Sequence, residues 1–155
     1  MGNLDQLKAV TFDVFGTVVD WRSSIAREIN LLADEKEVSI DGAEFASAWR
    51  SLYQPSMSKV RSGEIPFQPL DALHRNNLNT VLEQYDIDQL SESEKGHLNR
   101  VWHRLDPWPD VIEGLVRLKE RYIIGTLSNG NISLIVNMAK HSGLPWDVVL
   151  GAEVA

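Results

Sequence analysis

The sequence has no cysteine, no long apolar run and no cluster of basic residues. The absence of cysteine excludes disulfides, thiolate nucleophiles and cysteine-ligated zinc or iron–sulfur centres. The N-terminal segment MGNLDQLK lacks the apolar stretch of a secretory signal. No apolar run reaches the roughly 18 residues of a membrane-spanning helix. We therefore expect a cytoplasmic protein that does not enter a membrane.

The charge balance is acidic, with 15 Lys and Arg residues against 22 Asp and Glu residues and a formal net charge of -7. Such a surface repels polyanions, so we expect no nucleic-acid partner. The net charge does not exclude a small anionic substrate, because local positive charge can oppose the overall negative field. Hydrophobic residues make up 43% of the 155 residues, which is typical of a globular protein with a real core.

Short apolar segments rich in β-branched and aromatic residues predict strands. Residues 8–15, KAVTFDVF, form the first, and a Gly-Thr pair breaks it. Residues 122–129, YIIGTLSN, form the second and end in small polar residues. Residues 146–154, WDVVLGAEV, predict the start of a third strand.

Helical patterns fill most of the remaining sequence, and no strand is predicted between residues 22 and 104. Asp41 is expected to cap one helix of this region, and SESE at 91–94 matches a capping box that opens another. In the second half, Pro109 predicts a helix start and Gly143 a helix end. Alternation of strands and helices after a helical insert predicts an α/β fold with a parallel sheet.

Polar residues follow the first two predicted strands. Asp13 ends the first strand, and Ser128 with Asn129 end the second. Ligands of open α/β sheets bind outside the carboxyl ends of the strands, so these side chains form a candidate site. Each also has an ordinary interpretation: an aspartate after a strand often caps a turn, and Ser128-Asn129-Gly130 would pass as a plain loop.

The motifs Asp13-Val14-Phe15-Gly16-Thr17 and TLSNG at 126–130 resemble those of the haloacid dehalogenase superfamily. Within it, FDVFGTVVDW looks most like the type II, or (S)-2-haloacid, dehalogenases, and AWR at 48–50 and PWPDV at 107–111 extend the likeness. The resemblance implies a Rossmann-like core with an inserted all-helical cap. The core would comprise residues 1–17 and 105–155, and the cap residues 18–104.

The resemblance also implies roles for individual residues. Asp13 matches the nucleophile of the family. Thr17, Ser128 and Asn129 match positions that hold the nucleophile and the substrate carboxylate, and Arg50 matches the cap arginine that receives the leaving halide. For Arg50, a solvated or ion-paired helix residue is the ordinary alternative.

Phe15 separates two branches of the superfamily. The phosphatases carry a second aspartate at this position, which protonates an alkoxide leaving group. A halide leaves without a proton, so an apolar ring suits carbon–halogen cleavage and favours it over phosphoryl transfer. A haloacid brings one negative charge rather than the two of a phosphate, so we expect neither a metal nor another cofactor.

Relatives implied by the resemblance continue beyond residue 155 with a lysine motif and an acidic motif. We therefore expect a C-terminally truncated chain, with impaired hydrolysis of short (S)-2-haloalkanoic acids. A phosphatase or other hydrolase that uses Asp13, and an inactive protein that only binds a ligand or partner, are the alternatives. The apolar cap helices are compatible with a homodimer.

Overall fold

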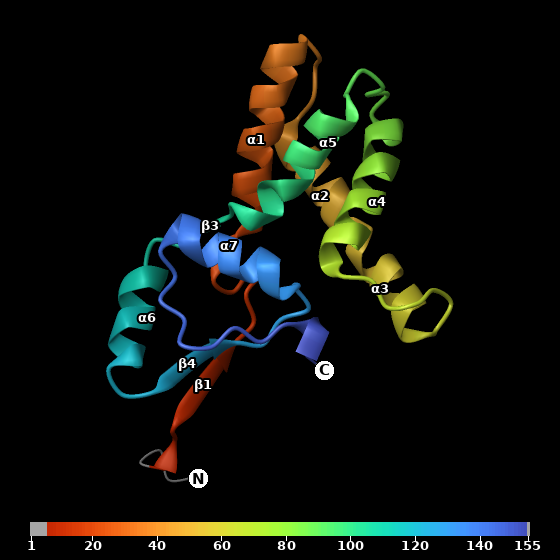
Figure 1. Ribbon diagram of the computed structural model, residues 1–155. Helices are drawn as coiled ribbons and strands as arrows, with labels where there is room; N and C mark the ends of the chain where they lie inside the picture. Colours follow the sequence, from red (N-terminus) through yellow and green to blue (C-terminus); the bar gives the residue numbers. More distant parts are fainter. Residues whose placement is uncertain (1–5, 155) are drawn as a thin grey trace. The chain divides into compact units, whose positions relative to one another are not determined.

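The computed structural model describes residues 6–154 and divides the chain into two compact units. The core unit contains residues 6–21 and 103–154, and the helical unit contains residues 22–102. Figure 1 shows the strands β1 and β4 in the first unit and a group of helices in the second. The predicted α/β class with a helical insert is confirmed. The division at residues 21 and 102 lies a few residues from the predicted domain boundaries, which stay a prediction.

Two parallel strands form the longer of two sheets in the core unit, β1 (Ala9–Phe12) and β4 (Ile123–Thr126). Their register pairs Ala9 with Ile123 and Phe12 with Thr126. The amide of Leu127 donates to the carbonyl of Phe12 at 2.8 Å, just beyond the paired residues. The carboxyl ends of both strands therefore meet at one edge of the sheet.

The segment after residue 146 lies along the other side of β4 but is not the third strand that the sequence predicts. It forms an isolated bridge between Gly125 and Val148 and then a short 3-10 helix, η3 (Ala152–Val154). Beyond this bridge, hydrogen bonds to a side chain replace the backbone pairing of a strand. The Thr126 hydroxyl donates to the Leu150 carbonyl (3.0 Å) and accepts from the Leu150 amide (2.9 Å). Among the described residues, no strand pairs with the outer edge of β1.

The helices of the core unit are α6 (Val111–Lys119) and α7 (Ile132–Ser142). Gly143 ends α7 as predicted, with a φ of 69° that glycine adopts readily. The predicted start of α6 at Pro109 is wrong by two positions, because the Val111 amide first closes a turn onto the Trp108 carbonyl at 3.1 Å. Both helices bury apolar side chains, namely Leu115, Leu134, Ile135 and Met138.

A second, very short sheet in the core unit pairs β2 (Val19–Asp20) with β3 (Asp106–Pro107) in antiparallel fashion. It joins the segments that precede and follow residues 22–102. Neither strand was predicted, because two residues carry no hydrophobic period.

The helical unit is built from α1 (Trp21–Lys36), α2 (Gly42–Ser51), α3 (Tyr53–Arg61), α4 (Leu70–Gln84) and α5 (Glu92–Asn99), followed by the 3-10 helix η2 (Arg100–His103). Both predicted caps are confirmed. The Asp41 carboxylate accepts from the amides of Ala43 and Glu44 at 2.8 and 2.9 Å, and Ser91 and Glu94 form the capping box. The helix α3 lies in the region predicted to be helical but was not predicted as a separate helix, because none of its residues is buried and it shows no apolar stripe.

Aromatic rings fill the centre of the helical unit. Trp49 is 1% exposed and lies edge-on to Phe45 and Trp102, with ring centroids 6.3 and 5.5 Å apart. The imidazole of His74 stacks on Trp102 at 4.0 Å, and the Trp49 indole N–H donates to the His74 carbonyl at 3.0 Å. Edge-to-face packing of this kind adds about 0.5–1.5 kcal/mol per pair to the burial of the rings.

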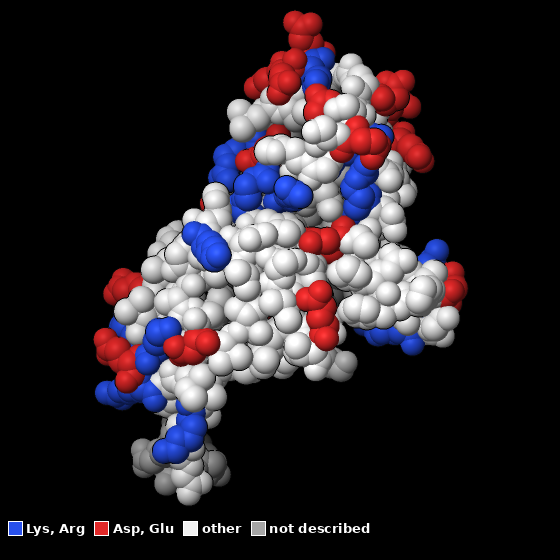
Figure 2. Space-filling model, in the orientation of Figure 1, with Lys and Arg blue, Asp and Glu red and all other residues white. Residues whose placement is uncertain are grey.

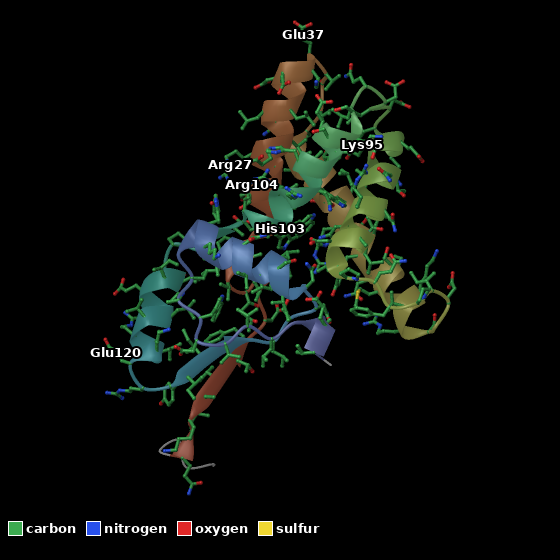
Figure 3. All side chains as sticks on the ribbon, viewed as in Figure 1. Arg27, Glu37, Lys95, His103, Arg104 and Glu120 are labelled. Carbon is green, nitrogen blue, oxygen red and sulfur yellow. The ribbon has the colours of Figure 1, made fainter. Side chains whose placement is uncertain are left out.

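Charged side chains lie among uncharged ones on the face of the helical unit that Figure 2 shows. Figure 2 shows carboxylates gathered over the end at which α1 finishes. Glu37 projects from this end and Lys95 lies on α5 (Figure 3). Within residues 6–154, every helix is too short or too polar to cross a bilayer.

Candidate active site

Asp13 directly follows β1 at the carboxyl edge of the sheet, and its side chain is exposed. The Thr17 hydroxyl donates a hydrogen bond to Asp13 Oδ2 at 3.1 Å. The structure therefore brings the predicted nucleophile together with the first of its predicted partners.

A tight turn returns the chain from Asp13 toward β2. The amides of Val18 and Val19 both donate to the Val14 carbonyl, at 2.9 and 3.2 Å, and the Gly16 amide donates to the Val19 carbonyl at 3.0 Å. Gly16 has a φ of 92°, which L side chains rarely adopt. The space beside Gly16 is not restricted in the same way, because a Cβ there would lie in ordinary van der Waals contact with Trp21 Nε1, at 3.5 Å.

Trp108 holds the outside of this turn. Its indole Nε1 donates to the Gly16 carbonyl at 3.1 Å, and its backbone amide donates to the Val18 carbonyl at 3.1 Å. Trp108 was not among the predicted site residues. Its only signal was its place in the PWPDV motif, since 92 residues separate it from Gly16.

The loop after β4 lies at the same sheet edge. The Ser128 hydroxyl accepts from the Gly130 amide at 3.2 Å, and the Asn129 side chain is exposed. Gly130 is buried, and a Cβ added to it would lie 3.3 Å from the ring of Phe15. Residues from both motifs, Phe15 and Gly130, are thus in contact range.

The C-terminal segment supports this loop from a second side. Glu153 Oε2 accepts from the amide of Ile132, the first residue of α7, at 2.6 Å. A carboxylate at a helix N-terminus satisfies an otherwise open amide and complements the helix dipole. Sequence reasoning missed Glu153, because a cap 21 residues away leaves no local pattern.

Arg50 belongs to the helical unit, near the C-terminal end of α2. Its guanidinium lies 4.2 Å from the centre of the Tyr53 ring, in a cation–π arrangement. Its predicted approach to the substrate of Asp13 stays a prediction. Within residues 6–154, histidine, aspartate and glutamate side chains form no group of three or more with metal-binding geometry.

The chain is similar to known proteins over nearly all of its described length. Residues 7–154 match the family model of the haloacid dehalogenase-like hydrolases. A solved defluorinating L-2-haloacid dehalogenase is 48% identical and superposes with a TM-score of 0.93 over 96% of this chain. A second L-2-haloacid dehalogenase structure is 41% identical, with a TM-score of 0.91 over the same share.

A curated (S)-2-haloacid dehalogenase 4A of Burkholderia cepacia is 28% identical over 142 residues, or 91% of this chain. The chain spans 58% of the length of that relative, and 61% and 63% of the two solved structures. Because the family model covers nearly every described residue, including both motifs of the site, the chain belongs to the haloacid dehalogenase-like hydrolases.

Proposed function

We propose that the chain carries the nucleophilic centre of an enzyme that hydrolyses short (S)-2-haloalkanoic acids to 2-hydroxy acids. The observation that carries the proposal is the Asp13 carboxylate at the sheet edge, held by Thr17 and followed two residues later by Phe15. The 48% and 41% identical structures, both named as L-2-haloacid dehalogenases, support it.

In the first step, an Asp13 carboxylate oxygen attacks C2 of the haloacid from the side opposite the halogen. A C–O bond forms as the carbon–halogen bond breaks, and the bonding pair leaves with the halide. The product is an aspartyl ester of the 2-hydroxy acid. Because attack occurs once at this carbon, its configuration inverts.

In the second step, water attacks the ester carbonyl of Asp13 and the acyl–oxygen bond breaks. This releases the 2-hydroxy acid and restores the carboxylate. The balance is one haloacid anion and one water giving one hydroxy acid anion, one halide and one proton. No metal or other cofactor takes part in either step as proposed.

Phe15 and Arg50 have separate roles toward the leaving group. A halide needs no general acid, so the ring of Phe15 can stand where a phosphatase would hold its proton donor. The guanidinium of Arg50 would receive the halide, and Ser128 with Asn129 would bind the substrate carboxylate. Weak hydration of a guanidinium favours it over an ammonium group for this task.

The proposal is tested by incubating the purified chain with (S)-2-chloropropanoate and following chloride release together with the intact protein mass. We expect a burst of chloride and an adduct that maps to Asp13, with slow release afterwards if hydrolysis is impaired. Asp13→Asn should show neither. Wild-type protein that forms no adduct and releases no chloride, while remaining folded, would refute the proposal.

The same preparation distinguishes the other candidates. Magnesium-dependent release from p-nitrophenyl phosphate, without chloride release, would indicate a phosphatase. Binding of a 2-haloacid that Asp13→Asn retains, without any adduct in the wild type, would indicate a protein that only binds. Sedimentation of the same sample tests the proposed homodimer.

A further inference from the structure

The indole of Trp108 makes a specific polar contact rather than a packing contact. It donates to the Gly16 carbonyl at 3.1 Å although the side chain is 37% exposed. The N–H of an exposed indole can donate its hydrogen bond to water. Here it donates to one backbone carbonyl, and this bond fixes the position of the ring. Trp108 holds the turn at a second point as well, through its backbone amide on the Val18 carbonyl.

The carbonyl that receives this bond belongs to the peptide group between Gly16 and Thr17. In a planar trans peptide the C=O and the N–H point in opposite directions. A donor on the Gly16 oxygen therefore fixes the orientation of the Thr17 amide as well. The hydroxyl of Thr17 is the group that donates to Asp13 Oδ2.

Gly16 makes this external support necessary. Its φ of 92° lies in a region where a glycine is free to move. Inside the turn, the Gly16 amide is held by the Val19 carbonyl at 3.0 Å. On the outside, the Trp108 indole N–H donates to the carbonyl of Gly16.

The geometry points to Trp108 as a positioning residue: its indole N–H, through the Gly16 carbonyl, sets the peptide that places the Thr17 hydroxyl on Asp13. The inference deepens the proposed function in its catalytic part and rests on it there. The effect on the turn itself depends only on the hydrogen bond.

Two variants remove the N–H, and the second of them isolates it. Trp108→Phe keeps an aromatic body, and replacement of Trp108 by β-(3-benzothienyl)alanine keeps the shape of the indole with sulfur in place of N–H. The matched control is Trp146→Phe. The Nε1 of Trp146 is buried in the same unit, without a hydrogen-bond partner in the described part of the chain.

The first measurement is amide hydrogen exchange by NMR on the full chain. We expect exchange at Gly16, Val18 and Val19 to accelerate about fivefold in both Trp108 variants, as for the loss of a typical hydrogen bond. Exchange at Ile124, in the sheet, should stay unchanged. Trp146→Phe should leave the turn amides as in the wild type.

The second measurement is the rate of Asp13 ester formation from (S)-2-chloropropanoate. Both Trp108 variants should lower the maximal rate about tenfold while the half-saturating concentration stays within about twofold, because substrate binding groups are untouched. A purely structural role would instead lower stability without this separation.

The outcomes keep the two proposals apart. Unchanged exchange at the turn amides in the benzothienyl variant overturns the positioning role, whatever the activity. Faster exchange in a chain that forms no ester leaves the hydrogen bond established and refutes the proposed function. Faster exchange with an unaltered rate of ester formation shows that the bond does not position Thr17, and that also overturns the inference.

Discussion

The carbonyl oxygen of Gly130 lies so close to Gly151 that a Cβ on Gly151 would stand only 2.4 Å from it. Two residues later, Glu153 accepts from the first amide of α7. The segment from Gly151 to Glu153 is thus pressed against the loop that carries Ser128 and Asn129. The atoms nearest to the Cβ position of Gly151 are backbone atoms, so no flexible side chain could move aside.

Gly151→Ala should therefore destabilise the core unit by about 1–3 kcal/mol, as for an overpacked site. Gly114→Ala is the control, because Gly114 lies inside α6 with nothing within 4 Å of its Cβ position. That change should stabilise the chain by about 0.5–1 kcal/mol through helix propensity. Urea unfolding measures both, and equal stability of the two variants would show that the segment yields freely.

Thr17→Val should slow the formation of the Asp13 ester. The valine keeps the shape of the side chain but removes the hydroxyl that donates to Asp13 Oδ2. A hydrogen bond to a charged group contributes about 1.5–3 kcal/mol, so we expect a loss of about tenfold to a hundredfold. Single-turnover mass spectrometry gives the rate. Thr17→Ser retains the hydroxyl and should recover most of it; a serine variant as slow as the valine variant would count against the hydrogen bond.

Arg50→Met should slow chloride departure strongly, by about a hundredfold on the scale of a lost electrostatic donor. Arg61→Met is the control on the neighbouring helix, since its guanidinium bonds only to Gln54 and Ser58 among the described residues. Stopped-flow measurement of the chloride burst compares them. Equal rates for the two variants would remove Arg50 from the reaction.

The helical unit should lose stability in acid between pH about 4.5 and 2. A hydrogen bond from Lys36 and two from Ser91 lower the pKa of Glu94 from 4.5 to about 2. A carboxyl whose pKa is lower in the folded than in the unfolded state stabilises the fold at pH values above its unfolded pKa. This contribution disappears as the pH falls through the folded pKa. The difference in unfolding free energy between wild type and Glu94→Gln should shrink across this range.

Fluorescence of Trp49 and Trp102, both buried in the helical unit, reports this transition. Lys36→Met should remove much of the same pH-dependent difference, because Lys36 is the first partner of Glu94. The double variant Lys36→Met with Glu94→Gln should then add little. Additive losses would show that the two residues act separately.

Chelation should leave the first step unchanged. The proposed displacement needs a carboxylate, a cation for the halide and no metal, so EDTA should not alter the chloride burst. Chloride release is measured before and after dialysis against EDTA, and again with added Mg²⁺. A burst that is lost on dialysis and restored by Mg²⁺ would contradict the proposed chemistry.

Local patterns in the sequence determined the elements that carry the site. The apolar run before Asp13, the Gly-Thr break and the small polar residues after the second strand predicted β1, β4 and the residues at their ends. The caps at Asp41 and Ser91 could also be predicted, because each cap residue bonds to amides only two or three positions later in the chain. Those features depend on neighbours in the chain, so sequence alone specifies them.

Tertiary structure decided the contacts between distant segments. The predicted strand at 146–154 is replaced by side-chain bonds from Thr126 and by η3, because the register with β4 breaks after a single bridge. The bond from Trp108 to Gly16 and the cap by Glu153 are of the same kind. The sequence determines which residues are candidates for the site, whereas the tertiary structure determines which distant donors and acceptors contact their segments. Hydrogen bonds across 92 or 21 positions leave no periodic pattern in the sequence.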